Sequence, residues 1–286
     1  MTNAVTIKNL TKSYKDFSLK NIDLQIPKGS IFGLIGENGA GKSTLIKSML
    51  GAINSNYDIL QFFGSDLRTH EREIKEAISV IFEQTHFDLD FTTYVIGQIM
   101  GKVYKSWNQT KYIELIKKFN LPLDKKIIDF SRGMKMKLEF AVALSHDTKL
   151  IILDEATSGL DPVFRDDILE ILREYSEDEE HTILMSSHIT SDLAKIADYI
   201  CFIHNGEIVF TRSYDDIREN YGIVRCGQNM FEALSEEDIV AFRKEEHSYS
   251  VLVNNKYEIK KNIEDLVIES ASLEDIMLFT VKGEKI

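Results

Sequence analysis

The sequence predicts an α/β fold around a largely parallel sheet, because short apolar strand-like runs alternate with helical patterns. A glycine-rich loop between a strand and a helix supports the same class. Helical spacing from about residue 92 to 144 indicates an inserted helical subdomain. From about residue 213 the rhythm changes to mixed short strands and helices. We therefore expect a main domain over 1–212 and a small α+β accessory domain over 213–286.

Composition restricts the class of protein further. Of 286 residues, 43% are hydrophobic and 28% charged, as in ordinary globular proteins. The net charge of -12 argues against nucleic acid as a partner. Two cysteines without metal-ligand spacing favour a reduced cytosolic chain. No apolar run approaches the roughly 18 residues of a membrane span, so action at a membrane would require another subunit to cross it.

The individual elements follow from periodicity and turn residues. Strands are expected in the main domain over 5–10, 19–26, 30–35, 58–63, 79–82, 150–153, 182–186, 199–203 and 208–210. A helix should end near Leu50 and another should span 163–175. Asn205-Gly206 is typical of a tight hairpin turn. The accessory domain should hold strands over 250–253 and 266–268 and a helix over 273–279.

The glycine-rich loop fits the phosphate-binding pattern G-x-x-x-x-G-K-[ST]. Its residues are Gly36, Glu37, Asn38, Gly39, Ala40, Gly41, Lys42 and Ser43, followed by Thr44. Glycines let successive backbone N–H groups point at phosphate oxygens, and the helix that follows adds its N-terminal dipole. Lys42 would reach the terminal phosphates and Ser43 would bind Mg²⁺. A glycine-rich turn without a ligand is the alternative, and the strand before and helix after the loop argue against it.

Two acids, Asp154 and Glu155, follow the apolar run 150–153. The carboxyl ends of central strands are where α/β folds bind ligands. Asp154 would hold Mg²⁺, and Glu155 would act as general base toward the attacking water. The alternative is that one of the two acids merely caps the helix that follows.

Together with these motifs, the chain resembles an ATP-binding cassette (ABC) ATPase over roughly residues 4–212, because the remaining motifs stand in family order. They are Tyr14, Gln84 after a strand, the signature at 130–134 with Ser131 and Gly133, the loop 158–161 with Asp161, and His188. The signature departs from the common L-S-G-G-Q, since Phe130, Arg132 and Met134 replace three of its residues. Its form resembles that of bacterial exporters, including relatives that handle antimicrobial peptides.

The resemblance implies a RecA-like core with an antiparallel β subdomain, binding ATP and Mg²⁺. It implies catalytic roles for Lys42, Gln84, Glu155 and His188, and Mg²⁺ contacts for Ser43, Gln84 and Asp154. Tyr14 would stack on adenine, although a merely packing aromatic is the alternative. Ser131, Gly133 and Asp161 would act across a head-to-tail dimer, formed with a second copy or a paralogous subunit.

The function implied is an ATPase that drives export through a separate membrane-spanning permease subunit, from the inner face of the cell membrane. The residues Thr85 to Thr93 would touch that subunit or form a buried lid. Two other functions remain as alternatives. A soluble ABC ATPase usually has two cassettes or a long coiled coil between its motifs, and this chain has neither. A non-catalytic regulatory cassette would lack Glu155 or His188, and both are present.

Overall fold

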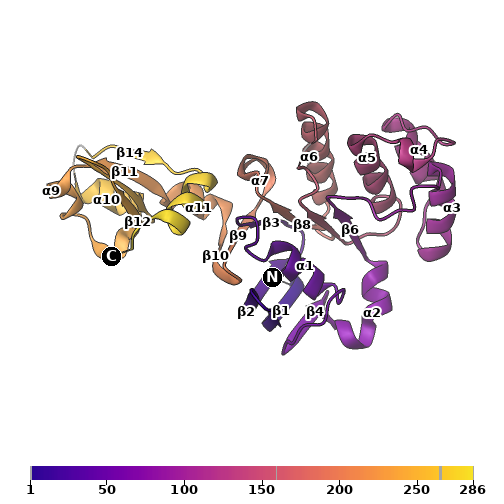
Figure 1. Ribbon diagram of the computed structural model, residues 1–286, viewed down its shortest axis with the longest axis horizontal. Coiled ribbons are helices and arrows are strands. Elements are labelled where there is room, and N and C mark those ends of the chain that lie inside the picture. The colour runs from indigo at the N-terminus through magenta and orange to yellow at the C-terminus, as the bar shows by residue number, and fades with distance from the viewer. Residues whose placement is uncertain (1, 159, 264–265, 286) are drawn as a thin grey trace.

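The computed structural model describes residues 2–158, 160–263 and 266–285 (Figure 1). It contains three sheets, and the largest is the parallel sheet that the sequence predicts. In Figure 1 this sheet lies in the middle of the molecule, with a group of helices at one end and the C-terminal elements at the other. The predicted α/β class is therefore confirmed.

The central sheet has six strands in the order β10-β9-β3-β8-β7-β6. All neighbours run parallel except β9 and β10, which form the predicted hairpin at Asn205-Gly206, where both φ angles are positive. The strands are β3 Ile31–Ile35, β6 Ile78–Phe82, β7 Leu150–Asp154, β8 Thr182–Ser187, β9 Tyr199–His204 and β10 Glu207–Ser213.

Both faces of this sheet are buried, as continuous apolar strands require. Ile151 and Leu153 of β7 belong to one core cluster, while Leu150 and Ile152 belong to another. The first cluster includes the inserted helices and part of the C-terminal segment. The second is closed by the four-stranded antiparallel sheet β2-β1-β4-β5. Its strands are β1 Asn3–Ser13, β2 Ser18–Pro27, β4 Ile59–Phe62 and β5 Ser65–Asp66.

Helices connect the strands and cover the sheet. Between β6 and β7 the chain forms α3 Thr93–Val103, α4 Gln109–Lys118, the 3₁₀ helix η1 Ile127–Asp129 and α5 Arg132–Ala143. The others of the main part are α1 Lys42–Met49, α2 Leu67–Glu76, α6 Pro162–Ser176 and α7 Thr190–Ile196. None of the helices in the described ranges is long and apolar enough to cross a bilayer.

The C-terminal segment has its own antiparallel sheet, in the order β12-β13-β11-β14. Its strands are β11 Gly222–Cys226, β12 Ile239–Lys244, β13 Tyr249–Val253 and β14 Ile268–Ser270. Its helices are α8 Tyr214–Asn220, α9 Gln228–Phe231, η2 Glu236–Asp238, α10 Lys256–Asn262 and α11 Leu273–Lys282. The strand expected at 266–268 instead begins at Ile268, because pairing with β11 rather than the apolar run fixes its register. The division at residue 212 stays a prediction.

Candidate active site

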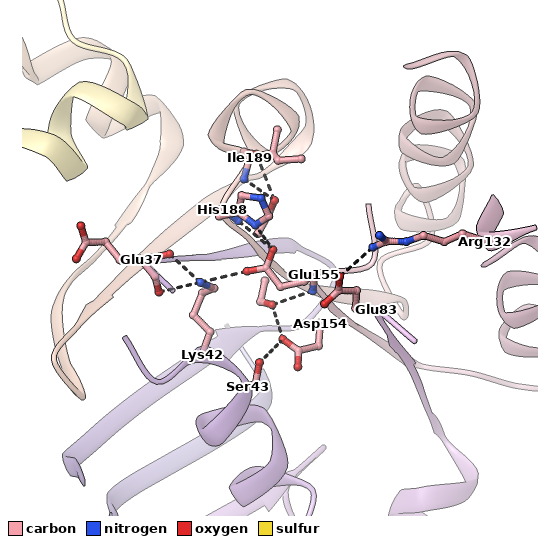
Figure 2. Close-up of polar contacts among 12 residues, drawn as sticks. Glu37, Lys42, Ser43, Glu83, Arg132, Asp154, Glu155, His188 and Ile189 are labelled. Atoms are coloured by element: carbon pink, nitrogen blue, oxygen red, sulfur yellow. Dashed lines mark hydrogen bonds and ion pairs between the residues drawn. The ribbon is translucent and has the colours of Figure 1, made fainter. Parts of the chain in front are cut away.

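The candidate site lies at the edge where three adjacent parallel strands end. β3 leads into the glycine-rich loop, β7 ends at Asp154, and β8, which lies between them, leads into His188. Since the carboxyl ends of parallel strands meet at one edge, segments far apart in sequence are brought side by side. Figure 2 shows Lys42, Ser43, Asp154, Glu155 and His188 gathered there.

The glycine-rich loop needs glycine at two positions for different reasons. Gly41, the residue before α1, has a φ of 115°, and a Cβ there would lie 2.8 Å from the side chains of Phe17 and Leu19. At Gly36 a Cβ would lie 2.5 Å from the carbonyl oxygen of Ile203. The loop therefore passes close to its neighbours before it opens the helix.

The other loop residues divide by exposure. Glu37, Asn38 and Gly39 are exposed at the tip, Ala40 is buried, and Thr44 is half-buried in the first turn of α1. An exposed tip in front of a helix N-terminus leaves backbone N–H groups accessible to an anion.

Lys42 is almost completely buried, and its ammonium is surrounded by oxygen atoms. Its Nζ donates to the carbonyl oxygens of Gly36 at 2.7 Å and Glu37 at 3.1 Å, and forms an ion pair with Glu155 Oε1 at 3.1 Å. A buried charge is stable only when it is paired and hydrogen-bonded. The side chain is thus held at the mouth of the loop.

Glu155 is the centre of the group of charged side chains. Its backbone adopts a left-handed conformation with a φ of 55°, which is costly for a residue with a side chain. Its Oε2 accepts hydrogen bonds from His188 Nδ1 at 2.5 Å and the His188 backbone N–H at 3.3 Å. Burial opposes ionisation of Glu155, but the charge of Lys42 and the contacts with His188 and Lys42 outweigh it. The pKa of this carboxyl is therefore lower than its ordinary value.

Asp154 is buried beside Glu155 and accepts two hydroxyl groups. Its Oδ1 accepts from Ser43 at 3.1 Å and from Ser186 at 2.7 Å. A carboxylate and a serine hydroxyl that converge in this way are hard oxygen ligands of the kind that Mg²⁺ prefers. Their arrangement therefore fits the metal predicted from sequence. Ser186 is a member of the site that sequence reasoning missed.

Comparison with known proteins identifies this arrangement. A profile of the ABC transporter family matches residues 19–158. The lantibiotic transport ATP-binding protein SrtF of Streptococcus pyogenes is 36% identical over 233 residues, which cover 79% of this chain and 97% of that protein. This chain belongs to the ABC transporter family. It is an ATP-binding subunit that hydrolyses ATP for transport.

Two further relatives of this ABC ATPase extend the comparison. The bacitracin transport ATP-binding protein BcrA of Enterococcus faecalis is 34% identical and covers 73% of this chain and 69% of its own length. A solved ATP-binding subunit of an ABC transporter matches with a TM-score of 0.69 and 26% identity, over 75% of this chain and 92% of that one. A dimeric post-hydrolysis cassette bound to ADP and Pi, 20% identical with a TM-score of 0.64, covers 73% of this chain and 98% of its own, and shares the fold.

Several residues expected at the nucleotide lie apart from the group around Glu155. Ser131 caps α5, where its Oγ accepts from Met134 N at 3.2 Å, and Gly133 follows in the first turn. Asp161 caps α6 in the same way, accepting from Phe164 N at 3.0 Å. These caps leave the helix starts exposed. The roles of Ser131, Gly133 and Asp161 stay predictions. Gly159, in the same loop as Asp161, lies outside the described residues.

Tyr14 and Gln84 also lie outside the group. The Tyr14 side chain is 50% exposed, and the ammonium of Lys12 lies 5.0 Å from its ring centre. Gln84 is exposed after β6, and among the described residues no hydrogen bond joins it to Ser43 or Asp154. Both stay predicted nucleotide or metal contacts.

An ion pair and a hydrogen bond join the loop after β6 to α5, and the sequence did not reveal either contact. Arg132 of the signature forms an ion pair with Glu83 at 3.0 Å, so its side chain is turned toward this loop (Figure 2). Thr85 donates to the half-buried Glu139 at 2.5 Å.

The segment from Thr85 to Thr93 contains two partly buried aromatic residues. Phe87 and Phe91 pack against the main core. This packing is closer to the lid interpretation than to an exposed aromatic surface.

The second of these contacts predicts a pH-dependent stability. Burial raises the pKa of Glu139 from 4.5 to about 7, against the hydrogen bonds from Thr85 and the His86 backbone. A raised folded-state pKa stabilises the fold below pH 4.5, and this contribution is lost as the pH rises through 7. We expect Glu139→Gln to raise the free energy of unfolding at pH 8 by about 1–3 kcal/mol relative to wild type, and far less at pH 4.

Urea unfolding at both pH values measures this difference. The exposed Glu114→Gln on α4 is the control. Equal shifts at pH 4 and pH 8 for Glu139→Gln would contradict the assignment.

Proposed function

We propose that two ATPase subunits bind MgATP head to tail, and that hydrolysis drives export through a separate membrane-spanning subunit at the inner face of the cell membrane. The glycine-rich loop 36–43 (the P-loop) of one subunit and the Ser131–Gly133 signature of the other would enclose each nucleotide. The observation that carries the proposal is the convergence of Lys42, Glu155 and His188 at one sheet edge. The partner is a second copy or a paralogue.

Mg²⁺ would be held by Ser43 and Asp154, with Gln84 reaching it when the loop after β6 moves. Among the described residues, no cluster of three or more His, Cys, Asp or Glu forms a metal cage. Mg²⁺ does not require one, because it usually takes one or two carboxylates together with substrate phosphates and water. The metal would neutralise charge on the phosphates, and the protein would supply its orientation.

Glu155 would orient and polarise the attacking water, and its lowered pKa keeps it ionised for that role. Lys42 and His188 would stabilise charge on the γ-phosphate. Phosphoryl transfer needs positioning and electrostatic stabilisation more than covalent chemistry. The chain offers both at one edge of the sheet, since Glu155 contacts Lys42 through one carboxylate oxygen and His188 through the other.

The signature would complete the site from the other subunit. The exposed Ser131 and the half-buried Gly133 lie at the start of α5, where backbone N–H groups and the helix dipole favour an anion. Asp161, at the exposed start of α6, would couple the two sites. Because both subunits would hold the γ-phosphate, ATP would bind the closed dimer more tightly than ADP does. This difference in affinity would let ATP favour the closed state over the open one.

The names of two relatives indicate the class of cargo. Two relatives carry names for lantibiotic and bacitracin transport, which supports export of an antimicrobial or amphipathic peptide or drug. Transport in these names also favours the transporter over the soluble ABC ATPase.

The role of Glu155 in hydrolysis can be tested by removing its charge. Glu155→Gln should lower kcat for ATP hydrolysis by about 10²–10⁴-fold, the usual worth of general acid–base catalysis, and should keep ATP binding. Steady-state hydrolysis and equilibrium ATP binding measure the two effects. Glu180→Gln, an exposed residue ion-paired with Lys28, is the matched control. Wild-type turnover in Glu155→Gln would remove this residue from the mechanism.

The composite site can be tested at Gly133. Outside its chain neighbours and the backbone of its own helix, a Cβ at Gly133 would meet no described atom within 4 Å, and an acid in the first turn of a helix is favourable. Gly133→Asp should therefore fold like wild type and bind ATP, yet abolish hydrolysis, because its carboxylate would face the phosphates bound by the other subunit.

Thermal unfolding and hydrolysis are measured side by side for this variant. Gly227→Asp, also in open space at a helix start, should keep full activity. An active Gly133→Asp would argue against the sandwich.

A further inference from the structure

Ser186 places one hydroxyl group between the two acids of the site. Its Oγ donates to Asp154 Oδ1 at 2.7 Å and accepts from the backbone N–H of Glu155 at 3.2 Å. The same N–H lies 3.2 Å from the Ser186 carbonyl oxygen. The residue is completely buried. A single side chain on β8 therefore contacts both functional residues at the end of β7.

The sheet register explains this position. Asp154 pairs with Ser186 where β7 and β8 run parallel, so both side chains project from the same face of the sheet. The hydroxyl has only one consistent orientation, because an ionised carboxylate can only accept and a backbone N–H can only donate. Ser43 approaches the same carboxylate oxygen from α1, a different element. Ser186 is thus the partner of Asp154 that belongs to the rigid sheet.

The contact with Glu155 has an energetic role. A left-handed backbone conformation is costly for a residue other than glycine, and Glu155 has a φ of 55°. Hydrogen bonds contribute to stability, and more so where an ionised group takes part. Both the hydroxyl and the carbonyl oxygen of Ser186 lie within hydrogen-bond distance of the Glu155 backbone N–H, so Ser186 contacts the strained residue at its backbone.

We propose that Ser186 is a positioning residue that fixes the metal-binding carboxylate of Asp154 and the backbone of Glu155 as one unit. The inference deepens the proposed function and rests on its assignment of Asp154 to Mg²⁺. Ser186 would act without touching ATP or the metal, because its hydroxyl is engaged by Asp154 and the Glu155 backbone N–H. Its effect on the reaction passes through the two acids, as that of an outer partner of a metal ligand does.

The test compares Ser186→Ala with Ser186→Thr, which keeps the hydroxyl. Mn²⁺ serves as the probe, and its affinity for the full-length ATP-bound protein is measured by electron paramagnetic resonance, beside kcat and KM. Ser186→Ala should bind Mn²⁺ about 10–100-fold more weakly and lose kcat to a similar extent. ATP affinity in EDTA should stay unchanged, and Ser186→Thr should recover most of both losses.

A matched control separates positioning from stability. Ser79→Ala removes another buried strand hydroxyl, one that contacts His146 and Thr148 instead of the acids. It should lose stability without any change in Mn²⁺ affinity. If Ser186→Thr does not fold, Ser186→Cys, which has nearly the same shape and a weak donor, should lie between serine and alanine.

If Ser186→Ala has the same Mn²⁺ affinity and the same kcat as Ser79→Ala, the inference is overturned. Asp154→Asn distinguishes that result from a failure of the proposed function. If Asp154→Asn weakens Mn²⁺ binding and Ser186→Ala does not, only the role of Ser186 is wrong. If Asp154→Asn has no effect, the metal assignment fails and the inference fails with it.

Discussion

The parallel pairing of β3, β8 and β7 is the constraint on which the site depends. It brings the P-loop, the acids and His188 to one edge, although Lys42 and His188 are far apart in the sequence. Because all three strands are buried on both faces, none can slip in register without moving apolar side chains out of a core. The geometry of the active site is thus fixed by the packing of the sheet.

The charged side chains at this edge balance one another. The buried ammonium of Lys42 is neutralised by Glu155, whose other carboxylate oxygen accepts from His188. An ATP phosphate would compete for the same ammonium, because a buried cation needs an anionic partner but does not need two. Under the proposed function, phosphate binding would weaken the ion pair between Lys42 and Glu155 and would leave that carboxylate for the attacking water.

Sequence patterns predicted most of the fold and the centre of the site, for reasons that can be named. Apolar runs marked the strands of the central sheet, and the P-loop and the two acids are local patterns whose order places them at strand ends. Ser186 and Glu139 could not be found in this way, because their partners are set by register and packing between distant segments. β14 was misplaced for the same reason, since an edge strand follows its partner.

Mixing two inactive variants tests whether each ATP site is built by two chains. Chains with Lys42→Ala and chains with Gly133→Asp would be purified separately, mixed, and assayed for ATP hydrolysis. In a head-to-tail dimer of one chain from each variant, both lesions fall in one site and the other site is intact. If each site is built by two chains, the mixture hydrolyses ATP although neither variant does alone. A mixture as inactive as its components, under conditions where the wild type is active, would contradict it.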